Sequence, residues 1–318
     1  MTWLNTRRGF DEIEALGDIT CGGVRASNPI FLASGTAGHG AELAPYMPLD
    51  KLGGIVVKSL SADAWPGNPA PRVHPTASGM LNSVGLQGDG VPHWTQHDLP
   101  VLEAVGATVV ASIWGRSVAD YARAAELLRP VSARLLAVEV NLSCPNLEGR
   151  SAIFAHDADL SAQVLAVVRA ELPSSSLWAK LSANTDRIVE IAGSVHAAGA
   201  DAVTLVNTML GLMIDTSTRR PVLGNGGGGL SGRAIHPIAV RAIHDIRRAH
   251  SELPIVGVGG VSNGDDVIEM MLAGASFVQV GTATFSDPRS GVKILRHASR
   301  RARELGVTRW QDLVNAAH

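Results

Sequence analysis

The sequence is poor in cysteine and in aromatic residues, and it carries almost no net charge. Two cysteines among 318 residues cannot supply the four ligands of a structural zinc site or of an iron–sulfur cluster. They also give no disulfide framework, so we expect a reducing, cytoplasmic compartment. A net charge of −2 and an aromatic content of 4% provide neither the electrostatic nor the stacking basis for binding nucleic acid.

We expect the chain to have no segment that would direct it to a membrane. Residues 1–18 carry charges throughout and have no apolar core typical of a signal peptide. No run of about 18 apolar residues occurs, so we expect no membrane-spanning helix. The eleven histidines show no H-E-x-x-H spacing and no other pattern typical of a metal site. The sequence therefore predicts no metal, no membrane partner and no nucleic acid.

Short apolar runs recur along the chain, and each is followed by an amphipathic or alanine-rich stretch. Near-continuous apolar strands that alternate with helices favour an α/β protein built as a closed (β/α)8 TIM barrel. An open, doubly wound sheet is the alternative on the pattern alone. The eight runs that we expect to be strands are 30–33, 54–57, 108–113, 136–140, 177–181, 202–206, 255–258 and 277–280.

The rest of the chain is predicted to form helices, a terminal hairpin and two long loops within one domain, 1–318. Residues 1–28 are an N-terminal extension and hairpin that turns at Gly22 and Gly23. Two insertions rich in Gly, Pro and Asn, 61–97 and 208–230, follow strand ends where a barrel carries its active site, and are expected to be lids or substrate walls. The expected helices are 117–128, 160–172, 185–198, 233–250 and 265–273.

The segment Asn-Leu-Ser-Cys-Pro-Asn, from Asn141 to Asn146, follows the fourth apolar run. Side-chain amides can both donate and accept hydrogen bonds. A thiol among them at the mouth of a strand suits a general base or a nucleophile, which points to Cys144. The alternative is a small buried hydrophobic residue before a turn, since free cysteine is often simply buried.

Polar groups and glycines end other strands too. Lys180 lies in an apolar run, and inside a barrel it needs a carboxylate or a cofactor beside it, unless it reaches the surface. Lys58 ends the second strand in the same way. Gly259-Gly260 and Gly281-Thr282 fit the phosphate site usual in barrels, with ordinary tight turns as the alternative. Together these groups predict a cationic pocket for a planar, anionic, amide-rich ligand.

These motifs together resemble the class 1 dihydroorotate dehydrogenases. Within that class, the segments 67–72 (Gly-Asn-Pro-Ala-Pro-Arg) and 85–87 (Gly-Leu-Gln) and the pair Asn207-Thr208 are most like the NAD-dependent 1B subclass. The resemblance extends from Pro29 to about Arg300 and rests on nine segments in order: 33–35, 58–59, 67–72, 79–87, 141–146, 206–208, 229–232, 257–261 and 281–282.

The resemblance implies an FMN enzyme of de novo pyrimidine (UMP) biosynthesis that oxidises dihydroorotate to orotate. Cys144 would take the C5 proton while a hydride passes from C6 to flavin N5. The substrate would be held by Lys58, Asn82, Ser83, Val84, Gly85, Leu86, Asn141, Asn146, Asn207 and Thr208. FMN would contact Ser34, Lys58, Ser59, Ser112, Asn141, Lys180, Val206, Gly232, Gly259, Gly260, Gly281 and Thr282.

The resemblance also implies partners and marks departures. It implies a homodimer, or a heterotetramer with an electron-transfer subunit that carries FAD and a [2Fe–2S] cluster. Class 2 relatives use serine as the base and carry an N-terminal membrane-binding segment, which we expect this chain to lack. Ser112 occupies a position where the family usually has an FMN-contacting asparagine, and Trp114 is bulky for that loop. A lid over 146–157 is expected beside the base.

Three other functions stay open on the residues. Lys58 or Lys180 could serve as the amine of a Schiff-base aldolase or lyase barrel. A non-catalytic barrel could bind a phosphate ligand as a regulatory or scaffold subunit. An FMN-dependent reductase could act on a related pyrimidine such as uracil. Bound flavin, turnover and substrate profiling, respectively, discriminate these from the dehydrogenase.

Overall fold

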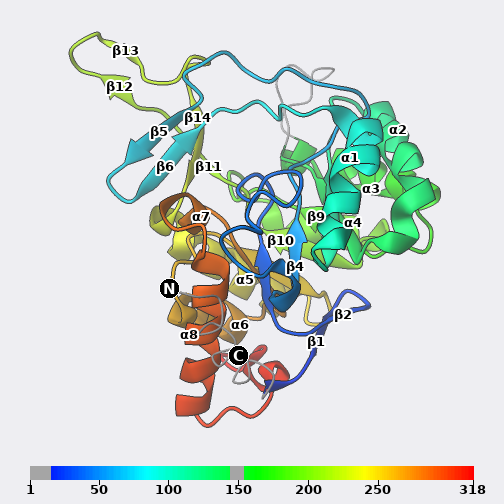
Figure 1. The fold of residues 1–318 in the computed structure, drawn as a ribbon, viewed down its shortest axis with the longest axis vertical. Coiled ribbons are helices and arrows are strands. Elements are labelled where there is room, and N and C mark those ends of the chain that lie inside the picture. Colours follow the sequence, from blue (N-terminus) through cyan, green and yellow to red (C-terminus); the bar gives the residue numbers. More distant parts are fainter. Residues whose placement is uncertain (1–15, 144–153) are drawn as a thin grey trace.

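The computed structural model describes residues 16–143 and 154–318. Eight parallel strands form a closed barrel, because the last one, β16, pairs in parallel with the first, β3, and places Val278 opposite Ile30. The predicted TIM barrel is confirmed, and the open-sheet alternative is wrong (Figure 1). The barrel strands in chain order are β3 (Ile30–Leu32), β4 (Gly54–Val56), β7 (Val109–Ile113), β8 (Ala137–Asn141), β9 (Leu177–Lys180), β10 (Ala202–Leu205), β15 (Ile255–Val258) and β16 (Phe277–Val280).

Helices follow the barrel strands and pack around them. Ser117 caps one of them by accepting a hydrogen bond from the Asp120 N–H, and Asn263 begins another with a capping box. The helices are α1 (Gly90–Ala104), α2 (Val118–Leu128), α3 (Ala158–Glu171), α4 (Ile188–Ala197), α5 (His236–Ala249), α6 (Gly264–Leu272), α7 (Ala283–Ser286) and α8 (Ser290–Glu304). Short 3-10 turns are η4 (Leu49–Lys51), η5 (Arg129–Arg134), η6 (Phe154–His156), η7 (Arg233–Ile235) and η8 (Trp310–Leu313).

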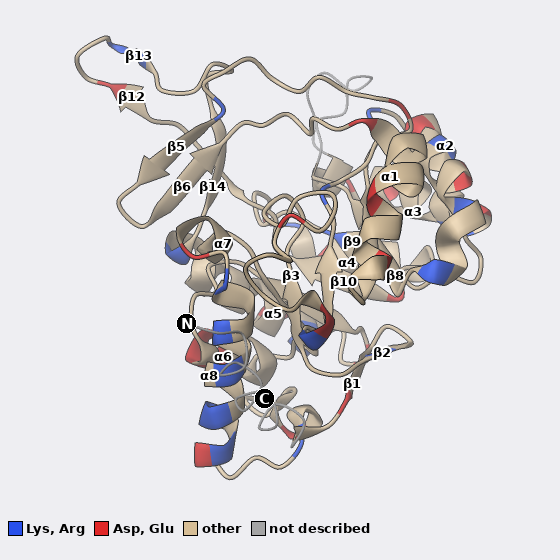
Figure 2. Cartoon of the chain, viewed as in Figure 1, with Lys and Arg blue, Asp and Glu red and all other residues tan. Residues whose placement is uncertain are grey.

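All five predicted helices are present, with ends that differ by a few residues. Residues 61–97 were expected to be a long loop, but α1 begins at Gly90 and two short strands, described below, precede it. Two prolines, Pro92 and Pro100, stand in α1 and hide its pattern from the sequence. The helix α8 was not predicted either, although its polar face carries a row of basic residues that is visible in Figure 2.

The predicted N-terminal hairpin is present and covers the N-terminal end of the barrel. Strands β1 (Ile19–Cys21) and β2 (Val24–Ala26) turn at Gly22 and Gly23, which both have positive φ. The Ser176 hydroxyl, just before β9, donates to the Gly22 carbonyl at 2.7 Å. The Cys21 thiol donates to the carbonyl of Ile255, at the start of β15.

The two insertions build a second sheet over the opposite end of the barrel. Its antiparallel strands, in order, are β11 (Met209–Gly211), β14 (Gly228–Ser231), β6 (Gly79–Asn82) and β5 (Val73–Thr76). A small hairpin, β12 (Ile214–Asp215) and β13 (Arg220–Pro221), projects beyond it (Figure 1). Gly228 and Gly229 lie in β14, where a Cβ at Gly229 would lie 2.0 Å from Thr208 Oγ1.

Aromatic side chains fill the lower part of the barrel interior. Phe31, Trp178 and Phe277 come from three barrel strands, and their ring centroids lie 4.7–5.8 Å apart. All three are fully buried. We call these residues the aromatic plug, because they close the barrel below the polar residues described next. Within the described residues, no helix is both long enough and apolar enough to span a bilayer.

Candidate active site

A cavity of about 260 Å³ lies between the C-terminal ends of the barrel strands and the antiparallel sheet. A second cavity of about 690 Å³ adjoins it and shares Met80, Gly260 and Thr282 with it. Together they have the size of a cofactor site. The described lining of the first cavity contains two lysines and no acidic residue. The predicted site residues that line it are Ser34, Lys58, Ser59, Asn82, Val84, Gly85, Leu86, Asn141, Lys180, Val206, Asn207, Thr208, Gly232, Gly259, Gly260, Gly281 and Thr282.

Four of the predicted site residues are placed elsewhere or are not described. Cys144 and Asn146, with most of the expected lid, lie outside the described residues. Ser83 accepts a hydrogen bond from Asn68 Nδ2 at 2.9 Å and is not part of the described cavity lining. Ser112 is also absent from that lining and is fully buried.

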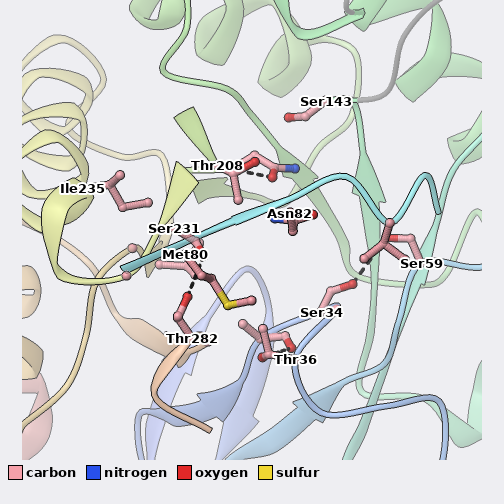
Figure 3. A pocket seen from close by; sticks show the side chains of 18 of the residues that line it. Ser34, Thr36, Ser59, Met80, Asn82, Ser143, Thr208, Ser231, Ile235 and Thr282 are labelled. Carbon is pink, nitrogen blue, oxygen red and sulfur yellow. Dashed lines mark hydrogen bonds between the residues drawn. The ribbon is translucent and has the colours of Figure 1, made fainter. Parts of the chain in front are cut away.

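Ser59 joins several polar side chains at the edge of the cavity (Figure 3). Its hydroxyl lies 2.9 Å from the Ser112 hydroxyl and 3.3 Å from the Ser34 hydroxyl. The Asn141 amide donates to the same oxygen at 3.1 Å. Ser112 therefore touches the cavity lining through Ser59.

Asn141 ends β8 and is fixed by its neighbours. Its side-chain oxygen accepts from Asn207 Nδ2 at 3.1 Å and from the Ser143 N–H at 3.2 Å. The Tyr121 hydroxyl, on α2, donates to the Asn141 carbonyl at 2.7 Å. The Thr208 N–H in turn donates to Asn207 Oδ1 at 2.7 Å. The amides at this edge of the barrel thus have fixed orientations, which suits recognition of a ring with set donors and acceptors.

The loop from Val84 to Leu86 is supported from behind by aromatic residues. Gly85 and Leu86 both have positive φ, so the loop turns sharply at the cavity. The Trp65 indole donates to the Gly85 carbonyl at 3.0 Å. Trp114 packs edge-to-face on Trp65, with ring centroids 5.9 Å apart. The bulk of Trp114, unexpected from the resemblance, therefore serves to support this loop.

Glycines form a concave backbone surface at the far end of the cavity. Gly232, Gly259 and Gly260 have positive φ. A Cβ at Gly232 would lie 2.7 Å from Gly79 Cα, and one at Gly260 would lie 2.9 Å from the Gly232 carbonyl. Next to them, the Thr282 hydroxyl donates to Ser231 Oγ at 2.8 Å (Figure 3). Side chains are excluded at these positions, and a bare backbone surface of this kind can hold a phosphate.

Lys180 has a carboxylate partner inside the barrel. Its ammonium lies 3.2 Å from Glu139 Oε1, and both side chains are buried. The expectation that Lys180 needs an anion is confirmed, and the surface-lysine alternative is wrong for it. Glu139 itself was not predicted, although a single acid in an otherwise apolar strand was the available signal. Among residues 16–143 and 154–318, no three His, Cys, Asp or Glu gather as metal ligands would.

Other cavity residues also escaped the sequence analysis. Met80 and Ser231 lie in segments that the resemblance marked, but nothing pointed to their side chains. Phe285 lies on α7, a four-residue helix too short to leave a periodic pattern.

Comparison with known proteins gives one consistent result. Residues 18–301 match the family described as "Dihydroorotate dehydrogenase". The chain is 42% identical over 291 residues to a protein of Listeria innocua, which covers 92% of this chain and 95% of that protein. It is 40% identical over 294 residues to a protein of Geotalea uraniireducens, with the same coverage of each chain. Both relatives are named "Dihydroorotate dehydrogenase B (NAD(+)), catalytic subunit".

Proposed function

This chain belongs to the dihydroorotate dehydrogenase family, and we propose from that premise that it oxidises dihydroorotate to orotate in pyrimidine biosynthesis. The names of the relatives favour the NAD-linked class 1B enzyme. The observation that carries the proposal is the cavity, in which two lysines and oriented amides lie beside a glycine cradle. An anionic pyrimidine ring and a phosphate-bearing cofactor need these two kinds of surface.

FMN fits the residues of this cavity. At Gly232, Gly259 and Gly260 a Cβ would collide with neighbouring protein atoms, so these positions need glycine, and their bare backbone can approach a phosphate closely. Ser34, Ser59 and Lys180 lie along the floor, where a flat ring system would rest. When bound there, the flavin supplies the hydride acceptor of the reaction. Lys180 would place positive charge near the N1 and O2 edge, where a reduced flavin gathers negative charge.

Substrate would be held above the flavin by amides and by Lys58. Asn82, Asn141 and Asn207 present donors and acceptors that match a pyrimidine ring, and Lys58 supplies a cation for the substrate carboxylate. Cys144 would act as the base that takes the C5 proton. It follows Ser143, whose N–H is bound to the fixed side chain of Asn141. A thiol base of this kind gives activity that rises toward alkaline pH, because a free cysteine has a pKa of about 8.5.

Electrons would leave this chain through a second subunit. The relatives are named as catalytic subunits, and two cysteines in the whole sequence cannot ligate an iron–sulfur cluster. We therefore place FAD and a [2Fe–2S] cluster on a partner, in a heterotetramer around a dimer of this chain. The Schiff-base alternative is weaker for Lys180, because an ammonium paired with Glu139 at 3.2 Å is not a free amine.

Absorbance spectroscopy tests the proposal. We expect the purified protein to show flavin bands at about 370 and 450 nm that bleach when dihydroorotate is added without oxygen. Replacing the base, Cys144→Ala, should slow the bleaching by about 10²- to 10⁴-fold. Cys21→Ala, which removes the other thiol far from the cavity, is the matched control and should bleach at the normal rate.

The outcomes separate the candidate functions. If another dihydropyrimidine reduces the flavin and dihydroorotate does not, the proposed substrate is wrong and the proposed cofactor stands. A protein that binds no FMN would contradict the proposal as a whole. The isolated chain should reduce its flavin but should not reduce NAD⁺ until the partner subunit is added.

A further inference from the structure

A buried carboxylate that the reaction itself does not require lies directly below the cavity. Glu139 is on β8, two residues before Asn141, and is fully buried. It lies opposite Trp178 of the aromatic plug in the pairing of β8 with β9. Water is therefore excluded from below, and an ionised carboxylate in this position is costly unless it is well paired.

Side chains from two other strands bind the Glu139 carboxylate. Lys180, on β9, places its ammonium 3.2 Å from Glu139 Oε1. Gln279, on β16 and fully buried, donates from Nε2 to Glu139 Oε2 at 2.9 Å. Each carboxylate oxygen thus has one partner, and the partners come from different sides of the barrel.

Lys180 is the member of this group that faces the cavity. It lines the cavity, whereas Glu139 and Gln279 do not. An ammonium has three donors, of which Glu139 uses one. The other donors are available to a ligand on the cavity floor. Among the described residues, Glu139 is the only acid paired with Lys180.

We propose that Glu139 is a positioning residue that holds the Lys180 ammonium at the cavity floor, with Gln279 holding Glu139 in turn. The inference rests on the proposed function, because the flavin is the ligand that Lys180 would serve. Without the carboxylate, the flexible lysine stem has no anchor above the apolar plug, and its charged end swings toward water. The flavin then loses the fixed positive charge that the Lys180 ammonium supplies.

Sulfite binding measures that charge without turnover. Sulfite uses its sulfur lone pair to form a bond to flavin N5, and the resulting negative charge resides at the N1 and O2 edge. A cation held there tightens sulfite binding, which is read from the loss of flavin absorbance. We expect Lys180→Met to weaken sulfite binding at least tenfold, and Glu139→Gln to weaken it by a similar factor.

A double-mutant cycle tests whether Glu139 acts through Lys180. In the combined variant Glu139→Gln with Lys180→Met, we expect sulfite to bind as in Lys180→Met alone. Glu139→Asp keeps the negative charge and should bind sulfite with an affinity between those of the wild type and Glu139→Gln. Thr204→Val is the matched control, because Thr204 is a fully buried polar residue that lies opposite Lys180 on β10; it should leave sulfite binding unchanged.

The results separate this inference from the proposed function. If the wild type binds FMN and is bleached by dihydroorotate, but Glu139→Gln binds sulfite as tightly as the wild type, the positioning role is wrong and the dehydrogenase stands. Additive effects in the cycle would also overturn it. If Glu139→Gln does not fold, sulfite binding by Glu139→Asp and by the neutral double variant tests the positioning role instead. The double variant is expected to fold, because replacing a buried ion pair by neutral groups is often tolerated. A wild type without flavin would contradict the proposed function instead.

Discussion

The side chain of Asn141 is held from three directions, by Ser59, Asn207 and the backbone of Ser143. Turning its amide over would break these hydrogen bonds, so the group keeps one orientation before any ligand arrives. Preorganised dipoles of this kind act without reorganising when charge develops. At the scale of single residues, the site is therefore prepared by contacts between its own polar groups.

The thiol of Cys21 should be inert in the folded protein. Burial raises the pKa of Cys21 to about 12, although the charge of Arg247 partly opposes this. Only a thiolate reacts readily with thiol reagents. In a Cys144→Ala variant, which leaves Cys21 as the remaining cysteine, we expect no labelling at pH 8 in the native state and one labelled thiol in denaturant. Rapid labelling of the folded variant would show that the hairpin does not cover Cys21 tightly.

His39 should make the protein less stable in acid. Burial lowers the pKa of His39, the charge of Lys58 lowers it further, and nearby acids oppose both. Below about pH 6.5 the unfolded chain binds a proton at this residue before the folded chain does. The free energy of unfolding therefore falls as the pH drops from 6.5 toward the pKa of the folded state.

Thermal unfolding at pH 7.5 and 5.5 measures the effect of His39. The drop in melting temperature should be smaller in His39→Gln than in the wild type. His97→Gln, at an exposed position on α1, is the control and should show the full drop. An equal drop in all three proteins would count against a buried neutral imidazole at His39.

Among the elements, the barrel strands were predictable and the second sheet was not. All eight barrel strands appear where apolar runs stand in the sequence, because strands covered by helices are apolar on both faces. The sheet over the cavity joins β5 and β6 of one insertion to β11 and β14 of the other. Its strands are short and rich in glycine, and no local pattern reveals pairing between such distant segments.

The site was predictable to a similar degree. Strand ends and the family resemblance named 17 of the 27 described residues that line the cavity, and they did not point to others such as Ile235 and Phe285. The side chains behind the lining were not found, because Glu139 and Trp114 act through contacts that sequence spacing does not encode. The sequence indicated that Lys180 needs a carboxylate or a cofactor beside it. Only the barrel geometry identified Glu139 as that partner.

Close packing of β6 against β14 should make Gly79 sensitive to substitution. A Cβ at Gly79 would lie 1.9 Å from the Ser231 carbonyl, so Gly79→Ala must force the two strands apart. Overpacking of this kind costs about 1–3 kcal/mol. Because β6 carries Asn82 and β14 leads to Gly232, we also expect weaker FMN binding in a fluorescence titration.

A nearby glycine serves as the control for this substitution. At Gly227 the nearest atom to a Cβ would be the Gly211 carbonyl, at 3.3 Å. Gly227→Ala should therefore bind FMN almost as the wild type does. Equal behaviour of the two variants would mean that the sheet moves aside easily and does not shape the cofactor site.

For the whole molecule, FMN should act as a stabilising ligand. At a concentration of 100 times its Kd, a ligand that binds only the folded state adds about 2.7 kcal/mol to the free energy of unfolding. In a protein of this size that raises the melting temperature by roughly 5 °C. We expect this rise when FMN is returned to flavin-stripped protein.

Riboflavin separates the contribution of the phosphate cradle to FMN binding from the contribution of the flavin ring. It has the same ring system but no phosphate, so it cannot use the glycine surface at Gly232, Gly259 and Gly260. We expect a clearly smaller rise in melting temperature with riboflavin at the same concentration. Equal rises would argue that these glycines serve the turns alone.

Closure of the barrel has a consequence for the biosynthesis of the protein. The Thr284 hydroxyl, just beyond β16, donates to the Thr36 carbonyl, just beyond β3, across 248 positions of the chain. On the ribosome, β3 emerges long before its neighbour β16 has been translated, and one edge of the growing sheet stays open during that time. Open apolar strand edges are surfaces that chaperones bind and through which nascent chains aggregate. The proposed cofactor cradle needs the last two strands as well, so we expect the flavin to bind the released chain and not the nascent one.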